Sequence, residues 1–110
     1  VYMAITQSQS HDVGVVNRAL GRYITTGTAA AIDIDCGFKP RYVRVVNTTS
    51  RDMMEWFEGM ADASAIKTVA AGTRTKITSK GITPSSHGFT IGLDTDVNVT
   101  NEQLSWLAEG

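Results

Sequence analysis

The sequence predicts an all-β protein: a single antiparallel β-sandwich, jelly-roll-like, with an extended N-terminal arm. Three observations lead to this prediction. The chain has 110 residues, which is the usual size of one domain. From residue 23 onwards, turn-forming residues recur about every ten residues, which is the spacing of short strands in a sandwich or barrel. Between these turns, apolar and polar residues alternate, as they do in strands with one buried face.

The first segment, residues 1–22, is predicted to be an arm outside the sandwich. Residues 7–12 form a continuous polar run. Residues 13–20 could form a helical turn or two, but Gly14 and Gly21 make a helix less favourable there. Such an arm either frays as an ordinary terminus or becomes ordered only against a neighbouring subunit, and the residues favour neither alternative.

Residues 23–110 form the predicted sandwich domain, with about seven or eight strands. Alternation of apolar and polar residues is clearest in residues 30–36, 89–93 and 97–100. Each of these segments is expected to be a half-buried strand. Chain reversals are expected at Gly27, 37–40, 48–50, Gly59, Gly72, Gly81, 84–86 and 95–96.

Two further segments have large apolar residues at both odd and even positions. Residues 42–46 and 53–57 therefore predict strands that are covered on both faces, either within the protein or by a partner. Residues 68–78 are rich in threonine and fit an exposed strand pair or a long hairpin.

A helix competes with a strand in two places. Residues 100–103 match a helix-capping box, but residues 104–108 alternate and the strand is favoured there. Residues 53–60 also contain an apolar stripe with helical spacing. Gly59 and the turn-like residues after it favour a strand followed by a loop.

Charge and hydropathy exclude several classes of partner. The formal net charge is −1, so the basic excess of nucleic-acid-binding proteins is missing and no nucleic-acid partner is expected. No apolar run approaches the roughly 20 residues of a membrane span, so no membrane partner is expected. No signal peptide is visible, and we expect the protein to be made and folded in a cytoplasm.

The residues that carry enzyme chemistry are scarce. The single cysteine, Cys36, continues an apolar alternation and is expected to be buried and inert. The two histidines, His11 and His87, fall in a polar run and in a turn, where exposed loop residues are the ordinary interpretation. The sequence therefore predicts a protein that is not an enzyme and has no catalytic residue.

Three pairs of carboxylates have spacings that a metal or glycosidase site could use. Asp33 with Asp35, and Asp94 with Asp96, could hold a cation, but no calcium-loop signature follows either pair. Glu55 and Glu58 would fall on opposite faces of a strand, whereas the two carboxylates of a glycosidase must face one another. No metal and no cofactor are therefore predicted.

The candidate interface consists of aromatic and basic side chains. Trp56 and Phe57 are neighbours in a predicted strand, so only one can face the protein's own core and the other can anchor a partner. Tyr42 is a further candidate, whereas Trp106 is expected to fill the core. The basic residues near residue 40 form either a solvated strand edge or a site for an acidic protein. The candidate interface residues are Trp56, Phe57, Tyr42, Arg41, Arg44 and Arg51.

Several segments resemble parts of phage virion proteins. Residues 37–47, GFKPRYVRVVN, resemble the strand opening GF-x-P-x-x-V of many phage virion β-sandwich proteins. Residues 55–60 (EWFEGM) and 67–73 (KTVAAGT) are similar to the middle of small phage capsid-associated proteins. Residues 88–92 (GFTIG) and 104–106 (LSW) are similar to the last strands of those proteins.

This resemblance, over about residues 27–108, implies a tailed-bacteriophage head decoration (cement) protein. Such a protein is located on the capsid surface, binds the major capsid protein, and stabilises contacts between capsomers. The resemblance also implies a homo-oligomer, with a trimer favoured, and an N-terminal arm that reaches a neighbour. The alternative is a phage tail or fibre component, such as a carbohydrate-binding module.

Overall fold

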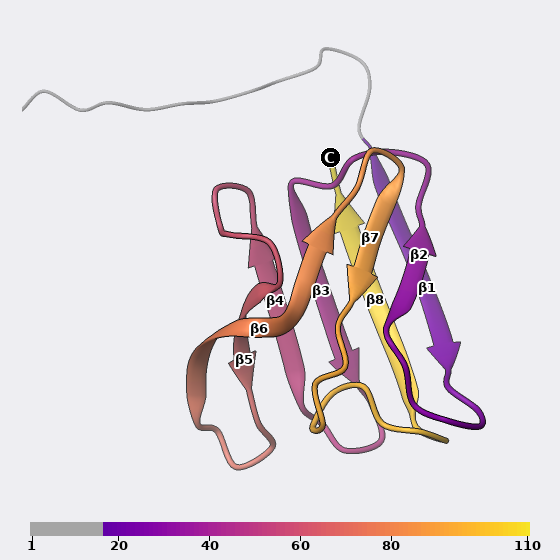
Figure 1. The fold of residues 1–110 in the computed structure, drawn as a ribbon, viewed down its shortest axis with the longest axis vertical. Coiled ribbons are helices and arrows are strands. Elements are labelled where there is room, and N and C mark those ends of the chain that lie inside the picture. The colour runs from indigo at the N-terminus through magenta and orange to yellow at the C-terminus, as the bar shows by residue number, and fades with distance from the viewer. Residues whose placement is uncertain (1–16) are drawn as a thin grey trace, which may run out of the picture.

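Eight strands and their connecting loops make up the part of the chain that the structure describes, residues 17–110 (Figure 1). The structure is a computed structural model. Residues 17–110 contain no helix, and the predicted all-β class is confirmed. The strands are β1 (Arg18–Ile24), β2 (Ile32–Asp35), β3 (Tyr42–Asn47), β4 (Met53–Phe57), β5 (Ser64–Thr68), β6 (Arg74–Pro84), β7 (Gly88–Ile91) and β8 (Gln103–Glu109).

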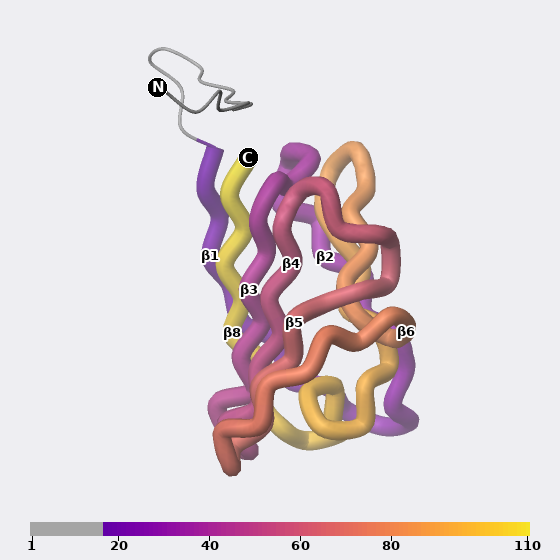
Figure 2. Tube along the Cα trace, turned by 90° about the vertical axis from the view of Figure 1, so that its left-hand side faces the viewer, coloured from indigo at the N-terminus to yellow at the C-terminus, as the bar shows by residue number. Residues whose placement is uncertain are grey.

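The strands form one continuous sheet in the order β1-β8-β3-β4-β5-β6-β7-β2, and all neighbours are antiparallel. The sheet curls into a half-barrel, so that β6, β7 and β2 lie over β3, β8 and β1 (Figure 2). The predicted antiparallel pairing is therefore confirmed. The finer prediction of a jelly-roll-like sandwich is not confirmed, because the hydrogen-bonded ladder passes from one layer to the other without a break.

The sheet turns from one layer to the other within β6, the longest strand. Along the β5–β6 ladder, Ser64 lies opposite Ile82, whereas the next residue, Ala65, lies opposite Ile77. The β6 residues between these two partners bulge out of the ladder and bend the strand. A Cβ atom on Gly81 would lie 2.5 Å from the carbonyl oxygen of Ser64, so the close approach at this corner requires glycine.

The hydrophobic core fills the concave side of the curled sheet. The alternation predicted for residues 30–36 and 104–108 is confirmed, because Ile32, Leu104 and Ala108 are buried there. Trp106 is partly buried, and its ring meets that of Phe89 edge to face, with 5.5 Å between the centroids. The buried hydrophobic residues are Ile32, Val43, Val45, Met54, Trp56, Ala65, Ile82, Phe89, Ile91, Val97, Leu104 and Ala108.

The first strand begins inside the segment that the sequence assigned to an arm. The predicted boundary fell after residue 22, whereas Arg18–Ile24 pairs with β8 along its whole length. The last part of the predicted arm therefore belongs to the sheet. Residues 1–16 lie outside the described residues, and the arm stays a prediction for them.

The sheet has two open edges. β1 pairs only with β8, and β2 pairs only with β7, so one side of each strand has no strand beside it within residues 17–110. The two edge strands do not pair with each other, although they are consecutive in the chain. They run past one another at the same side of the half-barrel, in different layers (Figures 1 and 2). This opening leaves backbone donors and acceptors available for a further strand.

Candidate interaction surface

The convex side of β1, β8, β3 and β4 carries apolar side chains that the core does not use. Leu20 pairs with Leu107 across β1 and β8, and its side chain is 69% exposed. Leu107 in turn lies opposite Arg44, and diagonally from Tyr42 and Val46, on β3. We call Leu20, Tyr42, Val46, Phe57 and Leu107 the outer apolar surface.

A shallow hollow of about 230 Å³ lies within this surface. Alternation along the strands brings side chains from three neighbouring strands to the same convex face. The hollow is open and mainly apolar, which suits an apolar side chain of a partner better than a charged small molecule. It is lined by Leu20, Arg44, Val46, Ser105, Trp106 and Leu107.

The prediction that Trp56 and Phe57 face opposite sides is confirmed. Trp56 is 4% exposed, and its indole Nε1 donates a hydrogen bond to the carbonyl oxygen of Ala61 at 3.2 Å. Phe57 is 49% exposed and contacts Tyr42, its partner across β3 and β4, with 5.0 Å between ring centroids. Phe57 is thus the aromatic residue available to a partner, and Trp56 belongs to the core.

The hydroxyl of Tyr42 is held by a carboxylate on the same face. It donates a hydrogen bond to Glu55 Oε2 at 2.7 Å. Partial burial raises the pKa of Tyr42 to about 12, and the hydrogen bond to Glu55 and its negative charge act in the same direction. The phenol therefore remains a neutral donor at any physiological pH, and its ring is fixed beside Phe57.

We expect replacement of Glu55 by glutamine to lower the pKa of Tyr42, because the variant loses the charge that opposes tyrosinate formation. The measurement is an ultraviolet absorbance titration of the protein, from which the titration of Tyr42→Phe is subtracted to isolate Tyr42. The difference curve should have its midpoint at about 12 in the wild type. The same midpoint in both proteins would show that Glu55 does not control this hydroxyl.

The structure does not bring the predicted basic residues together. Arg41 precedes β3 and forms an ion pair of 3.1 Å with Glu58, whereas Arg51 lies in the turn after β3, at the other end of the strand. Arg44 is exposed near the middle of β3, beside the outer apolar surface. A strand of six residues is about 20 Å long, so these residues do not form one compact basic patch.

An ion cluster, mostly buried at Lys67 and Asp94 but exposed at Asp96, joins two segments that are distant in the sequence. Lys67 on β5 points to the concave side of the sheet, since its partner across the ladder is the buried Met54. Its ammonium group forms ion pairs with Asp94 at 2.9 Å and with Asp96 at 2.5 Å. Asp94 Oδ2 also accepts hydrogen bonds from the backbone N–H groups of Asp96 and Val97. Sequence reasoning found the Asp94–Asp96 pair but not its cation.

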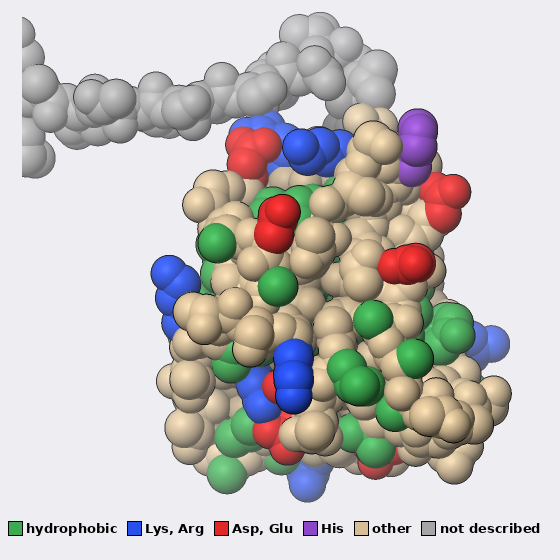
Figure 3. Space-filling view, in the orientation of Figure 1, with side chains coloured by type: hydrophobic (Ala, Val, Ile, Leu, Met, Phe, Trp, Pro, Cys, Tyr) green, Lys and Arg blue, Asp and Glu red, His purple; other side chains and the backbone are tan. Residues whose placement is uncertain are grey.

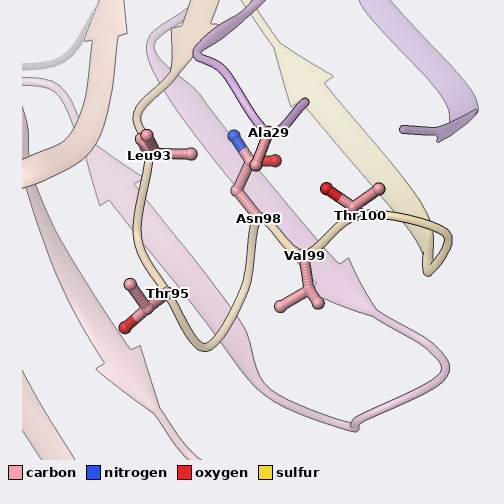
Figure 4. Close-up of a pocket in the computed structure, with 6 residues that line it drawn as sticks. All are labelled: Ala29, Leu93, Thr95, Asn98, Val99 and Thr100. Atoms are coloured by element: carbon pink, nitrogen blue, oxygen red, sulfur yellow. The ribbon is translucent and has the colours of Figure 1, made fainter. Parts of the chain in front are cut away.

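A second hollow, of about 320 Å³, lies between the loops that follow β1 and β7 (Figure 4). Asn98 closes its upper wall, where the side-chain amide donates hydrogen bonds to the carbonyl oxygens of Ala30 and Gly92. Leu93, Thr95 and Val99 surround the open part. The amide nitrogen of Asn98 thus joins the two loops, whereas its buried Oδ1 has no hydrogen-bond partner within residues 17–110, and the rest of the lining offers mainly apolar contact.

The remaining candidates for chemistry lie apart from these hollows. His87 is exposed in the turn between β6 and β7. Cys36 is partly buried against the core rather than fully buried as predicted. Within residues 17–110, no group of three potential metal-ligating His, Cys, Asp or Glu side chains is found, and there is no helix long and apolar enough to cross a membrane.

The face that carries β6 and β7 shows basic and acidic side chains interspersed among apolar and polar groups (Figure 3). Such a mixed surface is typical of a solvated face. The fold and the outer apolar surface together define a small all-β domain with an exposed apolar sheet face and two open edges. No family model, curated protein or solved structure matches this chain.

Proposed function

We propose that this chain is a non-enzymatic phage structural protein that binds the outside of the capsid and stabilises contacts between capsomers. One observation supports this proposal most: apolar side chains, including the 49% exposed Phe57, lie on the convex face of a rigid sheet. Exposed apolar patches of this kind mark sites of protein–protein contact. The proposed partner is the major capsid protein, and the proposed location is the capsid surface of a virion made in a host cytoplasm.

The physical role of such a protein follows from where it binds. Packaged DNA exerts pressure that pushes capsomers apart, and a protein bound across the joint between two capsomers adds interface area that resists this. The sheet is well suited to this role, because both β3 and β8 are hydrogen-bonded on two sides and hold Tyr42 and Leu107 in fixed positions. A rigid surface loses little conformational entropy on binding.

The test is a binding assay with capsids that lack this protein. We expect the wild type to bind them, and Phe57→Asp to bind about thirtyfold more weakly, because an interface anchor typically contributes 2 kcal/mol or more. Leu93→Asp is the matched control, since Leu93 is also an exposed apolar residue, at 38%, but lies at the loop hollow. Both variants should fold, because neither Phe57 nor Leu93 belongs to the buried core.

Two outcomes would contradict the proposal. A wild-type protein that never binds such capsids excludes the decoration role. Weak binding of Leu93→Asp together with normal binding of Phe57→Asp would place the contact at the loop hollow instead of the outer apolar surface.

A carbohydrate-binding component of a tail or fibre is the second candidate. One observation favours it: the exposed Phe57 ring lies beside Tyr42, whose hydroxyl is hydrogen-bonded to the carboxylate of Glu55. Aromatic rings flanked by carboxylates are suited to stacking on sugar rings and accepting hydrogen bonds from sugar hydroxyls. A glycan array with no binding, under conditions where the protein binds capsids, removes this candidate.

A further inference from the structure

The two open edges of the sheet carry charges of opposite sign on the same face. Along β1, Arg18 and Arg22 have the same parity as Leu20 and project from the convex side. Along β2, Asp33 and Asp35 project from the convex side, because Ile32 and Ile34 between them pack into the core. One edge of the molecule is therefore basic and the other is acidic.

Three of these four charges have no opposite charge across the ladder within residues 17–110, whereas Arg18 lies across the β1–β8 ladder from Glu109. Arg18 and Arg22 are exposed and form no ion pair there. Asp33 accepts a hydrogen bond from the hydroxyl of Thr90 at 2.7 Å, and Asp35 accepts one from the backbone N–H of Gly37 at 3.0 Å. Neither carboxylate has a cationic partner in the described part of the chain.

The basic edge also has the features of a strand that pairs with another. β1 is seven residues long, and Leu20 and Ile24 are 69% and 55% exposed. Proteins protect an open edge with short strands, prolines, bulges or charged side chains, and of these β1 has only the charges of Arg18 and Arg22, which favour a strand of opposite charge. β1 contains no proline and pairs with β8 in an unbroken register.

We propose that β1 of one molecule pairs with β2 of a second copy, in antiparallel orientation, and extends the sheet across the interface. When Arg22 lies opposite Asp33 of the partner subunit, Arg18 lies diagonally from Asp35 of the partner subunit. Both ion pairs are within reach of arginine side chains across neighbouring strands. The antiparallel orientation continues the alternation of strand direction that runs through the whole sheet.

Between two copies of the chain, pairing of β1 with β2 fits the charges of the edges better than pairing of β1 with β1. Pairing of β1 with β1 of another copy brings four arginines together, and like charges on neighbouring strands are destabilising. Pairing of β1 with β2 places opposite charges in contact, and both edges come from the same chain. This pairing can be tested with the purified protein alone, and it does not depend on the proposed capsid role.

The symmetry of the assembly follows from the two different edges. A contact between unlike surfaces is heterologous, so each subunit uses β1 toward one neighbour and β2 toward the other. Such contacts generate a closed ring if the rotation between subunits closes, and an open filament if it does not. The smallest closed case is a dimer in which each subunit pairs its β1 with the other's β2, and a trimeric ring is the next.

The experiment measures self-association of the full chain by sedimentation velocity over a range of concentrations. We expect the wild type to form species larger than the 11.8 kDa monomer. Arg18→Glu/Arg22→Glu, with two acidic edges, and Asp33→Lys/Asp35→Lys, with two basic edges, should each associate at least about tenfold more weakly. A mixture of the two variants should associate again, and so should the single chain that carries all four substitutions.

The control is Arg74→Glu/Lys76→Glu, which changes the net charge as Arg18→Glu/Arg22→Glu does but alters exposed residues of β6, a strand that is not at an edge of the sheet. It should associate as the wild type does. A wild type that remains monomeric at all concentrations overturns the inference, and so does a failure of the mixture and the fourfold variant to associate. An equal loss in the control also overturns it, because the effect is then one of net charge.

A cross-linking measurement separates pairing between chains from closure of the half-barrel within one chain. In a Cys36→Ser background, Arg22→Cys and Asp33→Cys are introduced into the same chain and the protein is oxidised. Disulfide-linked multimers support the inference. A monomer with an internal disulfide indicates that β1 and β2 of one chain pair with each other, and overturns it.

Discussion

Replacement of Gly88 by alanine is expected to lower the free energy of unfolding by about 3 kcal/mol or more. Gly88 is the first residue of β7 and is paired with Asp35 of β2. A Cβ atom at this position would lie 1.8 Å from the carbonyl oxygen of Ile34, far inside any contact distance. The obstructing atom belongs to the backbone, so the clash is relieved only if β2 moves away from β7.

The matched control for this variant is Gly59→Ala. A Cβ atom on Gly59 meets nothing within 4 Å, so the only penalty for alanine is the positive φ of 99°. This backbone strain lowers the free energy of unfolding by about 1–2 kcal/mol. Urea denaturation of both variants, together with hydrogen exchange of the β2 amides, measures the difference. We expect faster exchange in β2 for Gly88→Ala alone. Equal losses of stability in the two variants would refute the argument from the clash.

Most of the strands could be predicted because their apolar residues face the core. Residues 104–108 alternate, and β8 indeed buries Leu104 and Ala108. The threonine-rich residues 68–78 were predicted as an exposed pair or hairpin, and they span the end of β5, a turn and the first part of β6. Alternation of apolar and polar residues indicates a strand with one buried face, and most strands of this sheet have one face on the core.

β1 could not be predicted by the same rule. Its inward positions hold the small residues Ala19 and Gly21 and the 42% exposed Tyr23, whereas its outward positions hold Leu20 and Ile24. The reason is a contact from β8: a Cβ on Gly21 would lie 2.5 Å from the ring of Trp106, which occupies the space that a β1 side chain would fill. The apolar residues of β1 therefore lie on the face that a core-based rule expects to be polar.

The orientation of the candidate interface residues could be predicted in part. The opposite orientation of Trp56 and Phe57 follows from their adjacency in any strand, so the sequence was sufficient. The separation of Arg41 from Arg51 depends on the length of β3, and the two were grouped only because they are near in sequence. That the strands with opposite charges, β1 and β2, are the two edges depends on the order of strands in the sheet. The alternation of residues along each strand does not reveal this order.

The ion cluster around Lys67 leads to the second large expected effect. We expect Lys67→Met to lower the free energy of unfolding by about 3 kcal/mol, because loss of one partner leaves the buried Asp94 without a cation. The loop that contains Asp94 also places Val97 in the core, so its attachment to β5 affects packing. Adding Asp94→Asn should restore part of the loss, since asparagine keeps an acceptor for the same backbone N–H groups.

Lys76→Met is the control for this variant, because Lys76 is exposed on β6 and takes part in no ion pair within residues 17–110. Its effect should stay within about 0.5 kcal/mol. Urea denaturation at neutral pH measures the free energy of unfolding of the wild type and of the three variants Lys67→Met, Lys67→Met/Asp94→Asn and Lys76→Met. A loss for Lys67→Met no larger than that for Lys76→Met would mean that the cluster contributes little to stability.

The same cluster predicts a dependence on pH at the alkaline end. Burial lowers the pKa of Lys67, but hydrogen bonds to Asp96 and Asp94 more than offset this, so the pKa lies above its ordinary value of 10.5. A pKa that is higher in the folded state contributes stability that is fully present below about 10.5 and is lost as the pH rises through the folded-state value. The difference in stability between the wild type and Lys67→Met should therefore be constant from neutral pH to about pH 10 and decrease above it. Parallel stability curves for the two proteins up to about pH 11.5 would contradict the raised pKa, since all other titrating groups are common to both proteins and cancel in the difference.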